Sequence, residues 1–469
     1  MAIFIVSLLS LQVFINFLGA ISPELSFDAL WYHLTPAKLY LQYQQIFHLP
    51  GWLLSVSSLP RFTEMLYTAA LTFGNEIWAK LIHFLFGLGC LFALFNLLKR
   101  YFSIRVSLLG VLTFYTMLIV GWQSTTAYVD LAWTFFEILA LDSFLRWYEE
   151  RKESFLNQSA ILIGLAIATK ILAFASLFTY FVIILILKRK DWLKNALKFG
   201  CLSLLIVSPW LILSWVNVGN PFFPLFGSPT DVQAINVSPS ANWIVSKIVN
   251  LPFLLWQATF APDDIISPVY LLFLPLVLFI IWKQKPSFKI AGLYCLLGSF
   301  LVPSQSNRYL LPYLAALTLP LLAIFNHSWK KKELLFNVFT IIIIFSAFLS
   351  LGSRGLATKK FLPYLLGQET KSEFLTKNLN FSFGDFYDID GYFKENILPQ
   401  DLVLVYGIHN LYYVDFPYVH ESWVKPGTFF THILVAGEES LPKKFGPLVL
   451  QYQNPKTGVK LYLFGEEYR

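Results

Sequence analysis

The sequence places an acid and a histidine, Asp28 and His33, directly after an apolar run long enough to cross a bilayer. A carboxylate shielded by aromatic neighbours can act as a general base on a hydroxyl group, and it can also hold a divalent cation. Asp28 could instead cap a helix starting at Ala29, but no Glu or Gln stands three residues on to complete a capping box. We therefore favour a catalytic role for Asp28. His33 could bind a phosphate or a sugar hydroxyl, or it could be an ordinary hydrogen-bonded residue at the membrane interface.

Two further acids are candidates for the same face of the membrane. Asp130 lies beside Tyr128 near the start of a predicted span, where an acid is also favoured by the helix dipole alone. We treat Asp130 as a second catalytic carboxylate and Tyr128 as a substrate-binding side chain. Glu64 could orient a polar group of a substrate, although an ion pair with Arg61 is the slightly favoured alternative.

Two cations could stabilise an anionic leaving group such as a lipid phosphate. Lys170 stands in an otherwise apolar run, where a charge is costly unless it is used or paired. Arg308 and its neighbour Tyr309 follow a short polar loop, and Arg308 could hold two phosphate oxygens as a fork or could merely extend to the interface. We assign Lys170, Arg308 and Tyr309 to substrate binding.

The composition indicates the elements that must position these side chains. Of the 469 residues, 56% are hydrophobic and only 13% are charged, whereas soluble domains carry about 25% charged residues. The net charge of +7 does not indicate nucleic-acid binding, because the lysines form short clusters between apolar runs. The three cysteines lie inside apolar segments without metal-ligand spacing, so we expect neither a disulfide nor a structural metal.

Cationic clusters predict the orientation in the membrane. They lie at 99–105, 146–152, 188–198, 283–289 and 330–332, and the positive-inside rule places them in the cytoplasm. The segments 21–62, 219–242 and 303–308 then face outward, as does the stretch 353–469.

Apolar runs of sufficient length predict about 11 transmembrane helices. We treat the first of them as a retained helix rather than a signal peptide, because no basic segment precedes it. The run 159–187 is too short for two full crossings, so we interpret it as two short helices with Lys170 at the outer turn. The alternative is one long tilted span. The predicted spans are 2–20, 77–98, 104–121, 124–145, the pair within 159–187, 196–216, 268–282, 290–303, 309–325 and 334–351.

Two outward segments, 21–62 and 242–260, are apolar and aromatic enough to form interfacial or re-entrant helices. After residue 352 the composition changes to scattered charge, turn signals and short β patterns at 402–406 and 459–464. Helices are expected at 372–379 and 391–396. The chain is thus predicted to be an all-α polytopic membrane domain, residues 1–352, followed by a small extracytoplasmic α/β domain, residues 353–469.

Four stretches in order resemble the GT-C class of integral-membrane glycosyltransferases, which includes protein O-mannosyltransferases and lipid A aminoarabinose transferases. They are Phe27-Asp-Ala-Leu-Trp-Tyr-His-Leu34, Ile163-Gly-Leu-Ala-Ile-Ala-Thr-Lys170, Gly219-Asn-Pro-Phe-Phe-Pro224 and Asn307-Arg-Tyr-Leu-Leu-Pro312.

The resemblance implies a polyprenyl-phosphate sugar donor and a glycan, lipid or protein acceptor at the outer face of the plasma membrane. The enzyme would transfer a hexose or a pentose, with Asp28 in place of the first-loop catalytic acid of the class. Many relatives have paired acids where this chain has Asp28-Ala29, so a base role is favoured over a metal role. The resemblance fixes no cofactor, although a divalent cation could take part.

Two other classes of function fit the sequence less well. A secondary transporter of a lipid-linked or polar substrate predicts inverted repeats and polar residues near the bilayer midplane, and neither is clear in the sequence. A non-catalytic scaffold that presents the C-terminal domain would leave Asp28 and Lys170 unexplained.

Overall fold

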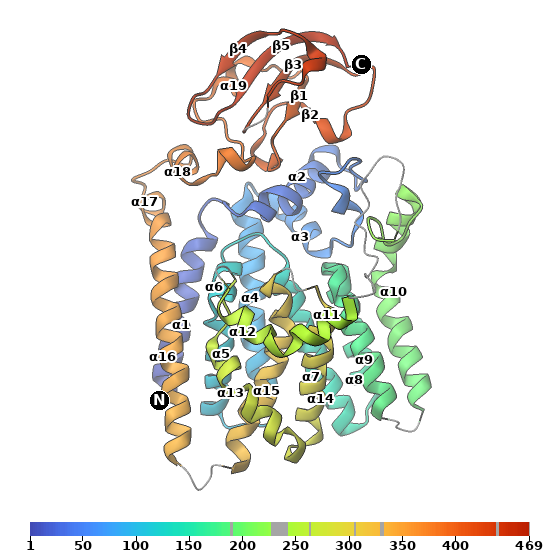
Figure 1. The fold of residues 1–469 in the computed structure, drawn as a ribbon, viewed down its shortest axis with the longest axis vertical. Coiled ribbons are helices and arrows are strands. Elements are labelled where there is room, and N and C mark those ends of the chain that lie inside the picture. The colour runs from blue at the N-terminus through green and yellow to red at the C-terminus, as the bar shows by residue number, and fades with distance from the viewer. Residues whose placement is uncertain are drawn as a thin grey trace.

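The computed structural model describes residues 1–187, 191–226, 243–261, 264–303, 306–328, 333–437 and 440–468. Long helices stand side by side in a bundle, and a small domain with a β-sheet lies across one end of them (Figure 1). We call that end the sheet-side face. The predicted outward loop 219–242 and the cationic clusters 188–198 and 330–332 fall partly or wholly outside the described residues.

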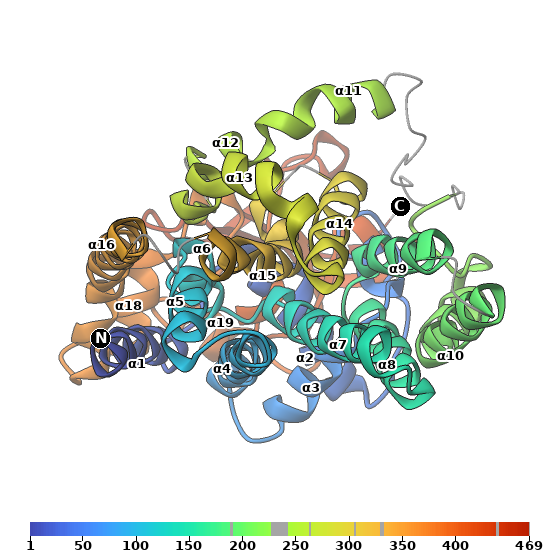
Figure 2. The ribbon, with the colours of Figure 1, turned by 90° about the horizontal axis from the view of Figure 1, so that it is seen from below.

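The helical part is built from sixteen α-helices among the described residues. Seen end-on, α1 and α16 lie side by side at one edge and α10 at the other (Figure 2). The helices are α1 (Ala2–Ala20), α2 (Leu34–Tyr43), α3 (Phe62–Leu71), α4 (Glu76–Lys99), α5 (Ile104–Tyr115), α6 (Leu118–Gln123), α7 (Asp130–Glu150), α8 (Glu153–Thr169), α9 (Phe174–Leu187), α10 (Trp192–Val218), α11 (Trp243–Asn250), α12 (Leu254–Thr259), α13 (Pro268–Ile280), α14 (Pro286–Leu301), α15 (Leu311–Ser328) and α16 (Glu333–Thr358).

Four helical segments of the described chain are long and apolar enough to cross a bilayer. They are Ala2–Ala20, Glu76–Lys99, Trp192–Val218 and Phe336–Leu365, and shorter apolar helices accompany them. The count of about 11 spans is therefore not confirmed. One reason is that predicted spans are interrupted: the run 104–121 divides into α5 and α6, and α7 begins only at Asp130, six residues later than predicted.

The break at Lys170 is confirmed. Helix α8 ends at Thr169, Lys170 adopts an extended backbone with φ −147° and ψ 120°, and α9 starts at Phe174. Helix α8 also begins at Glu153, earlier than predicted, and these added residues supply length that the run 159–187 lacked. Because α8 packs along α7, the turn at Lys170 after α8 lies beside Asp130, the first residue of α7.

The C-terminal part is a small α/β unit, as predicted, with a five-stranded mixed sheet in the order β2-β1-β3-β5-β4. Strand β1 pairs in parallel with β2 and β3, while β5 pairs antiparallel with β3 and β4. The predicted strands correspond to β1 and β5, and the predicted helices to α18 and α19. The elements are α17 (Leu362–Leu365), α18 (Lys371–Asn378), α19 (Tyr392–Asn396), β1 (Val403–Tyr406), β2 (Tyr418–His420), β3 (Phe429–Val435), β4 (Val449–Gln453) and β5 (Lys460–Glu467).

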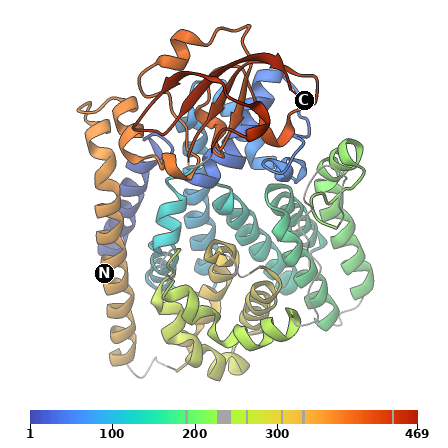
Figure 3. The same cartoon turned by 45° about the horizontal axis from the view of Figure 1, so that its top comes forward.

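Alternation along β1 decides how the sheet docks. Val403 and Val405 belong to the core that also contains Leu49, Leu53 and Leu54 of the segment 21–61 between α1 and α3, which we call the first long loop. The opposite face of the sheet forms a separate apolar cluster around Leu404, Ile433 and their neighbours. Side chains of a strand alternate between faces, so one face of the sheet is buried against the segment that follows α2 (Figure 3).

Polar contacts fix the same interface. Glu76, at the start of α4, is 1% exposed and pairs with Lys371 at 2.8 Å. Tyr413 Oη donates to Glu76 Oε1 at 3.0 Å, and Lys38 Nζ of α2 donates to the carbonyls of Tyr412 and Val414. Helix α16 itself ends at Thr358, and the division of the chain at 352/353 stays a prediction.

Candidate active site

Asp28 opens a π-helical turn, Ala29–His33, that leads directly into α2 within the first long loop. Its side chain makes no capping hydrogen bond to the backbone of that turn. Instead, Tyr32 Oη and Arg308 Nη2 both donate to Asp28 Oδ2 at 2.6 Å. The turn brings Tyr32 back over Asp28 four residues later, which is the local reason for this contact. The capping alternative is therefore not observed.

The second carboxylate and the second cation pair in the same way. Lys170 Nζ donates to Asp130 Oδ1, and the Asp130 side chain is completely buried. Asp130 Oδ2 has no hydrogen-bond partner among the described residues. An acid this deep needs a compensating cation, and the turn after α8 supplies it.

Tyr309 joins the two ion pairs. Lys170 Nζ lies 4.6 Å from the centre of the Tyr309 ring, and the Arg308 guanidinium carbon lies 5.5 Å from it. Arg308 also stands 5.0 Å over the Tyr128 ring, whose Oη accepts the Asp28 N–H at 3.3 Å. Six of the predicted residues thus form one cluster at the sheet-side face, which we call the charged corner. Its members are Asp28, Tyr128, Asp130, Lys170, Arg308 and Tyr309.

Burial and charge keep the groups of this corner in defined protonation states. Burial alone would lower the pKa of Arg308, but the negative charges of Asp130 and Asp28 raise it above its usual value. Burial, and then the Asp28 charge, raise the pKa of Tyr32 and of Tyr128. Arg308 is therefore a permanent cation, and both phenols keep their protons; Tyr32 uses its proton to donate to Asp28.

His33 and Glu64 lie next to the corner and bind each other. His33 Nδ1 is 2.9 Å from Glu64 Oε1, and both side chains are about 5% exposed. The alternative for Glu64 is also present, because Arg61 Nη1 lies 3.6 Å from the same oxygen. Arg61 further donates to the carbonyl of Tyr32 at 2.7 Å, so this group supports the turn that carries Asp28. A substrate-binding role for His33 and Glu64 stays a prediction.

Glu24, which sequence reasoning missed, holds the two loops of the corner together. Its Oε1 accepts the N–H groups of Leu25 and Ser26 at 2.9 Å, and its Oε2 accepts the Ala127 N–H at 2.7 Å. One carboxylate therefore ties the segment before Asp28 to the loop before Asp130. The signal available in the sequence was the one used for Asp28, an acid placed directly after an apolar run.

His83, also missed, fixes the same loop from within α4. Its Nδ1 lies 2.8 Å from the carbonyl of Thr126, and its Nε2 accepts the Leu131 N–H at 3.1 Å. Both ring nitrogens are thus used by the backbone on either side of Asp130. An ionisable residue in an apolar helix is the signal that could have found it.

No group of three or more His, Cys, Asp or Glu side chains that could hold a metal ion occurs among the described residues. Asp28 Oδ2 is already bound by Arg308 and Tyr32, and Asp130 Oδ1 by Lys170. The involvement of a divalent cation therefore stays an untested prediction.

Similarity to known proteins bears on the fold of the chain. Residues 65–215 match the dolichyl-phosphate-mannose-protein mannosyltransferase family. No curated protein sequence matches the chain. The structure of ArnT from Cupriavidus metallidurans bound to undecaprenyl phosphate is similar, with a TM-score of 0.62, 13% identity, and coverage of 98% of this chain and 97% of that one.

An oligosaccharyltransferase from Archaeoglobus fulgidus, in complex with zinc and sulfate, is similar over 97% of this chain and 73% of its own, with a TM-score of 0.54 and 13% identity. The protein therefore has the fold of the GT-C class of membrane glycosyltransferases, and the resemblance seen in the sequence is confirmed. It is an integral membrane protein.

Proposed function

We propose that this protein transfers a hexose or a pentose from a polyprenyl-phosphate donor to an acceptor hydroxyl at the outer face of the plasma membrane. The observation that carries the proposal is the charged corner, where two carboxylates and two cations from four distant segments meet at the sheet-side face. The GT-C fold supports the reaction class. The undecaprenyl phosphate bound to the similar ArnT supports the donor class.

Arg308 and Lys170 are the groups that would bind the donor phosphate. Both are partly shielded, with side chains 13% and 15% exposed. Fixed cations in such a site stabilise charge that develops as a bond breaks. A phosphate would compete with Asp28 for the guanidinium, since Arg can present two parallel N–H groups to phosphate oxygens.

Once Arg308 turns to the phosphate, Asp28 becomes available as the general base. The acceptor hydroxyl gives its proton to the Asp28 carboxylate while its oxygen forms a bond to sugar C1. The bond from C1 to the phosphate oxygen breaks, and the polyprenyl phosphate leaves with the electron pair. The sugar passes through an oxocarbenium-like state, as in other glycosyl transfers. Asp130 keeps Lys170 in place, and His33 and Glu64 support the turn that carries Asp28.

An apolar groove would receive the polyprenyl chain. A cavity of about 550 Å³ lies between α12, α13, α14, α15 and the short 3-10 turn at residues 251–252. Leu310, Leu314 and Leu317 line it, so the groove begins two residues after Arg308 and continues along α15. A lipid whose phosphate meets Arg308 could therefore place its chain in this groove.

Mass spectrometry of a panel of polyprenyl-phosphate sugars, incubated with the purified protein and an acceptor extract, tests the proposal. We expect loss of one donor and release of the polyprenyl phosphate. Asp28→Asn should lower the rate at least ~10²-fold, the lower bound for a general base, while the protein still inserts in the membrane. Asp191→Asn is the matched control, because Asp191 is an exposed acid at the start of α10.

Full turnover by Asp28→Asn would overturn the base assignment. The same assay with EDTA tests the divalent cation, because a cation held by Asp28 would make turnover sensitive to the chelator. Labelling of single cysteines in the C-terminal part from outside intact cells tests the proposed orientation.

A further inference from the structure

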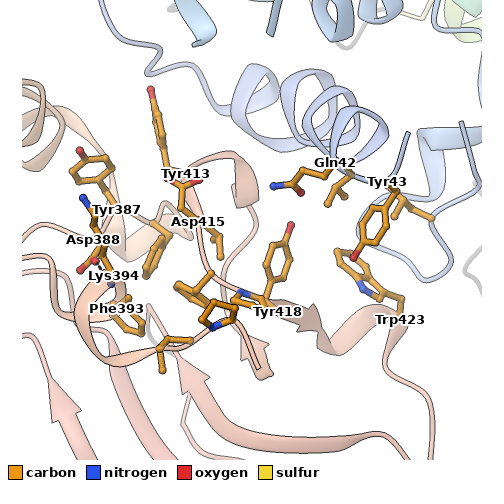
Figure 4. Close-up of a pocket in the computed structure, with 18 of the residues that line it drawn as sticks. Gln42, Tyr43, Tyr387, Asp388, Phe393, Lys394, Tyr413, Asp415, Tyr418 and Trp423 are labelled. Carbon is orange, nitrogen blue, oxygen red and sulfur yellow. Dashed lines mark hydrogen bonds between the residues drawn. The ribbon is translucent and has the colours of Figure 1, made fainter. Parts of the chain in front are cut away.

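A cavity of about 1300 Å³ lies between the first long loop and the C-terminal domain. It exceeds the ~300–1,000 Å³ of ordinary small-molecule sites, so its volume suits an extended ligand. Figure 4 shows Gln42 and Tyr43 of α2 on one side, and Tyr418 and Trp423 of the sheet domain facing them. The two walls thus come from segments that are more than 330 residues apart in the chain.

Aromatic rings form much of the lining. Tyr43 is 66% exposed at the end of α2, and Trp423 of the opposite wall is half-buried. Phe393 and Tyr387 line the other end of the cavity. Aromatic faces carry a negative quadrupole that attracts the C–H groups of a ligand, and a sugar ring presents such C–H groups on its flat faces.

Carboxylates and lysines stand between the rings. Asp388 Oδ2 accepts the Lys394 N–H at 2.9 Å, whereas its buried Oδ1 has no hydrogen-bond partner among the described residues. Asp415, whose side chain is 81% exposed, pairs with Lys38. A free carboxylate oxygen accepts hydrogen bonds only, so it favours a ligand with many hydroxyl donors over a phosphate or a carboxylate.

A row of ring contacts leads from this cavity toward the charged corner. Trp423 contacts His420 at 5.2 Å, His420 contacts Trp52 at 5.8 Å, and Trp52 contacts His409 at 5.8 Å between ring centres. His409 in turn lies 6.5 Å from Phe27, the residue before Asp28.

A second cavity of about 420 Å³ opens at this end of the row, between Phe27 and the ends of β1 and β3. Gly407 and Gly437, which follow those strands, line it. Ligands commonly bind at the carboxyl ends of parallel strands. A row of contacting rings thus lies between the two cavities, and Phe27, the residue before Asp28, lines the smaller one.

We propose that the cleft between the first long loop and the C-terminal domain binds a carbohydrate chain, which makes the acceptor a glycan. The inference rests on the proposed function, because only a transferase needs an acceptor beside Asp28. The rings would stack on the sugar units, and the free oxygen of Asp388 would accept a hydroxyl. The end of the chain would reach Asp28 through the smaller cavity.

The test is binding of fluorescently labelled linear hexose oligosaccharides of increasing length, followed by anisotropy, to the full-length protein in lipid nanodiscs. The protein carries Asp28→Asn, so that binding is measured without transfer. We expect affinity to rise with chain length and then to level off. Tyr43→Ala and Asp388→Asn, each added to Asp28→Asn, should weaken binding at least fivefold.

Phe73→Ala is the matched control for the aromatic change, because Phe73 is 76% exposed and lies outside the cleft. Glu466→Gln is the control for the charge change, since Glu466 is an exposed acid on β5. Both controls should bind as the parent does. An uncharged hexapeptide of Ala, Ser and Gly serves as the competing ligand class.

Binding that is absent for every oligosaccharide, independent of chain length, or unchanged in both cleft variants would overturn the inference, as would preferential binding of the hexapeptide. Failure of the proposed function is a separate result. In that case the wild-type protein consumes no polyprenyl-phosphate sugar, whatever the oligosaccharides do.

Discussion

Replacing Lys170 with Met tests whether the Asp130–Lys170 pair serves the reaction or only the fold. The substitution keeps all but the last atom of the side chain's length, and it leaves the completely buried Asp130 without its nearest cation. Breaking a buried ion pair costs ~3–5 kcal/mol. Because Arg308 also acts on Asp130, we expect the lower end of that range.

The double variant Lys170→Met/Asp130→Asn removes both charges, so most of the lost stability should return. Apparent melting temperatures from tryptophan fluorescence, measured in one detergent, would give the coupling between the two changes. Asp130→Asn alone is the other single variant that this double-mutant cycle needs. It should cost less, since Lys170 is 15% exposed and can turn toward solvent.

Activity separates the two roles. If Lys170 binds the departing phosphate, Lys170→Met should lower donor consumption ~10²–10³-fold, as the loss of one preorganised donor does elsewhere. The stable double variant should be equally slow. Wild-type donor consumption by the double variant would refute the reasoning, because the pair would then be structural only.

Four further outcomes are expected. Gly51 has φ +89°, and an added Cβ would lie 1.8 Å from the Ser422 carbonyl oxygen, so Gly51→Ala should loosen the C-terminal domain and speed its proteolysis. Gly367→Ala, at φ +71° with open space around it, should show only the ~1–2 kcal/mol of backbone strain. Burial lowers the pKa of His420 to about 3, so this neutral ring contributes stability above pH 6.5 that is lost as the pH falls toward 3. The loss of stability is up to ~1.4 kcal/mol per pH unit. The melting temperature should therefore fall less between pH 7 and pH 5 in His420→Asn than in the wild-type protein. Glu24→Gln leaves at least one buried N–H without its acceptor and should cost ~1–3 kcal/mol, measured as a lower melting temperature together with slower donor consumption.

The apolar runs made much of the helical fold predictable. Ala2–Ala20 was predicted with its observed bounds because nothing interrupts its apolar run. The break at Lys170 followed from a length argument, since one bilayer crossing uses about 20 residues. The short β patterns likewise identified β1 and β5, because alternation is visible within a few residues.

What stayed hidden depends on contacts between distant segments. The loop before Asp130 reads as helix, but Glu24 and His83 bind its backbone and delay the start of α7. Asp28 and Arg308 are 280 residues apart, so their pairing has no local signal. The sequence placed both on one face through the cationic clusters, and only the folded chain shows that they touch.

The charged corner has a consequence for how a donor would arrive. Its two carboxylates and two cations cancel, and each anion lies against a cation. Such a set of charges produces almost no long-range field, so electrostatic steering from solution would contribute little. A lipid-borne donor moving within the bilayer plane would meet the apolar groove along α15 first and the phosphate contacts last. Capture would then be a two-dimensional search, set by lipid diffusion and indifferent to the salt of the surrounding medium.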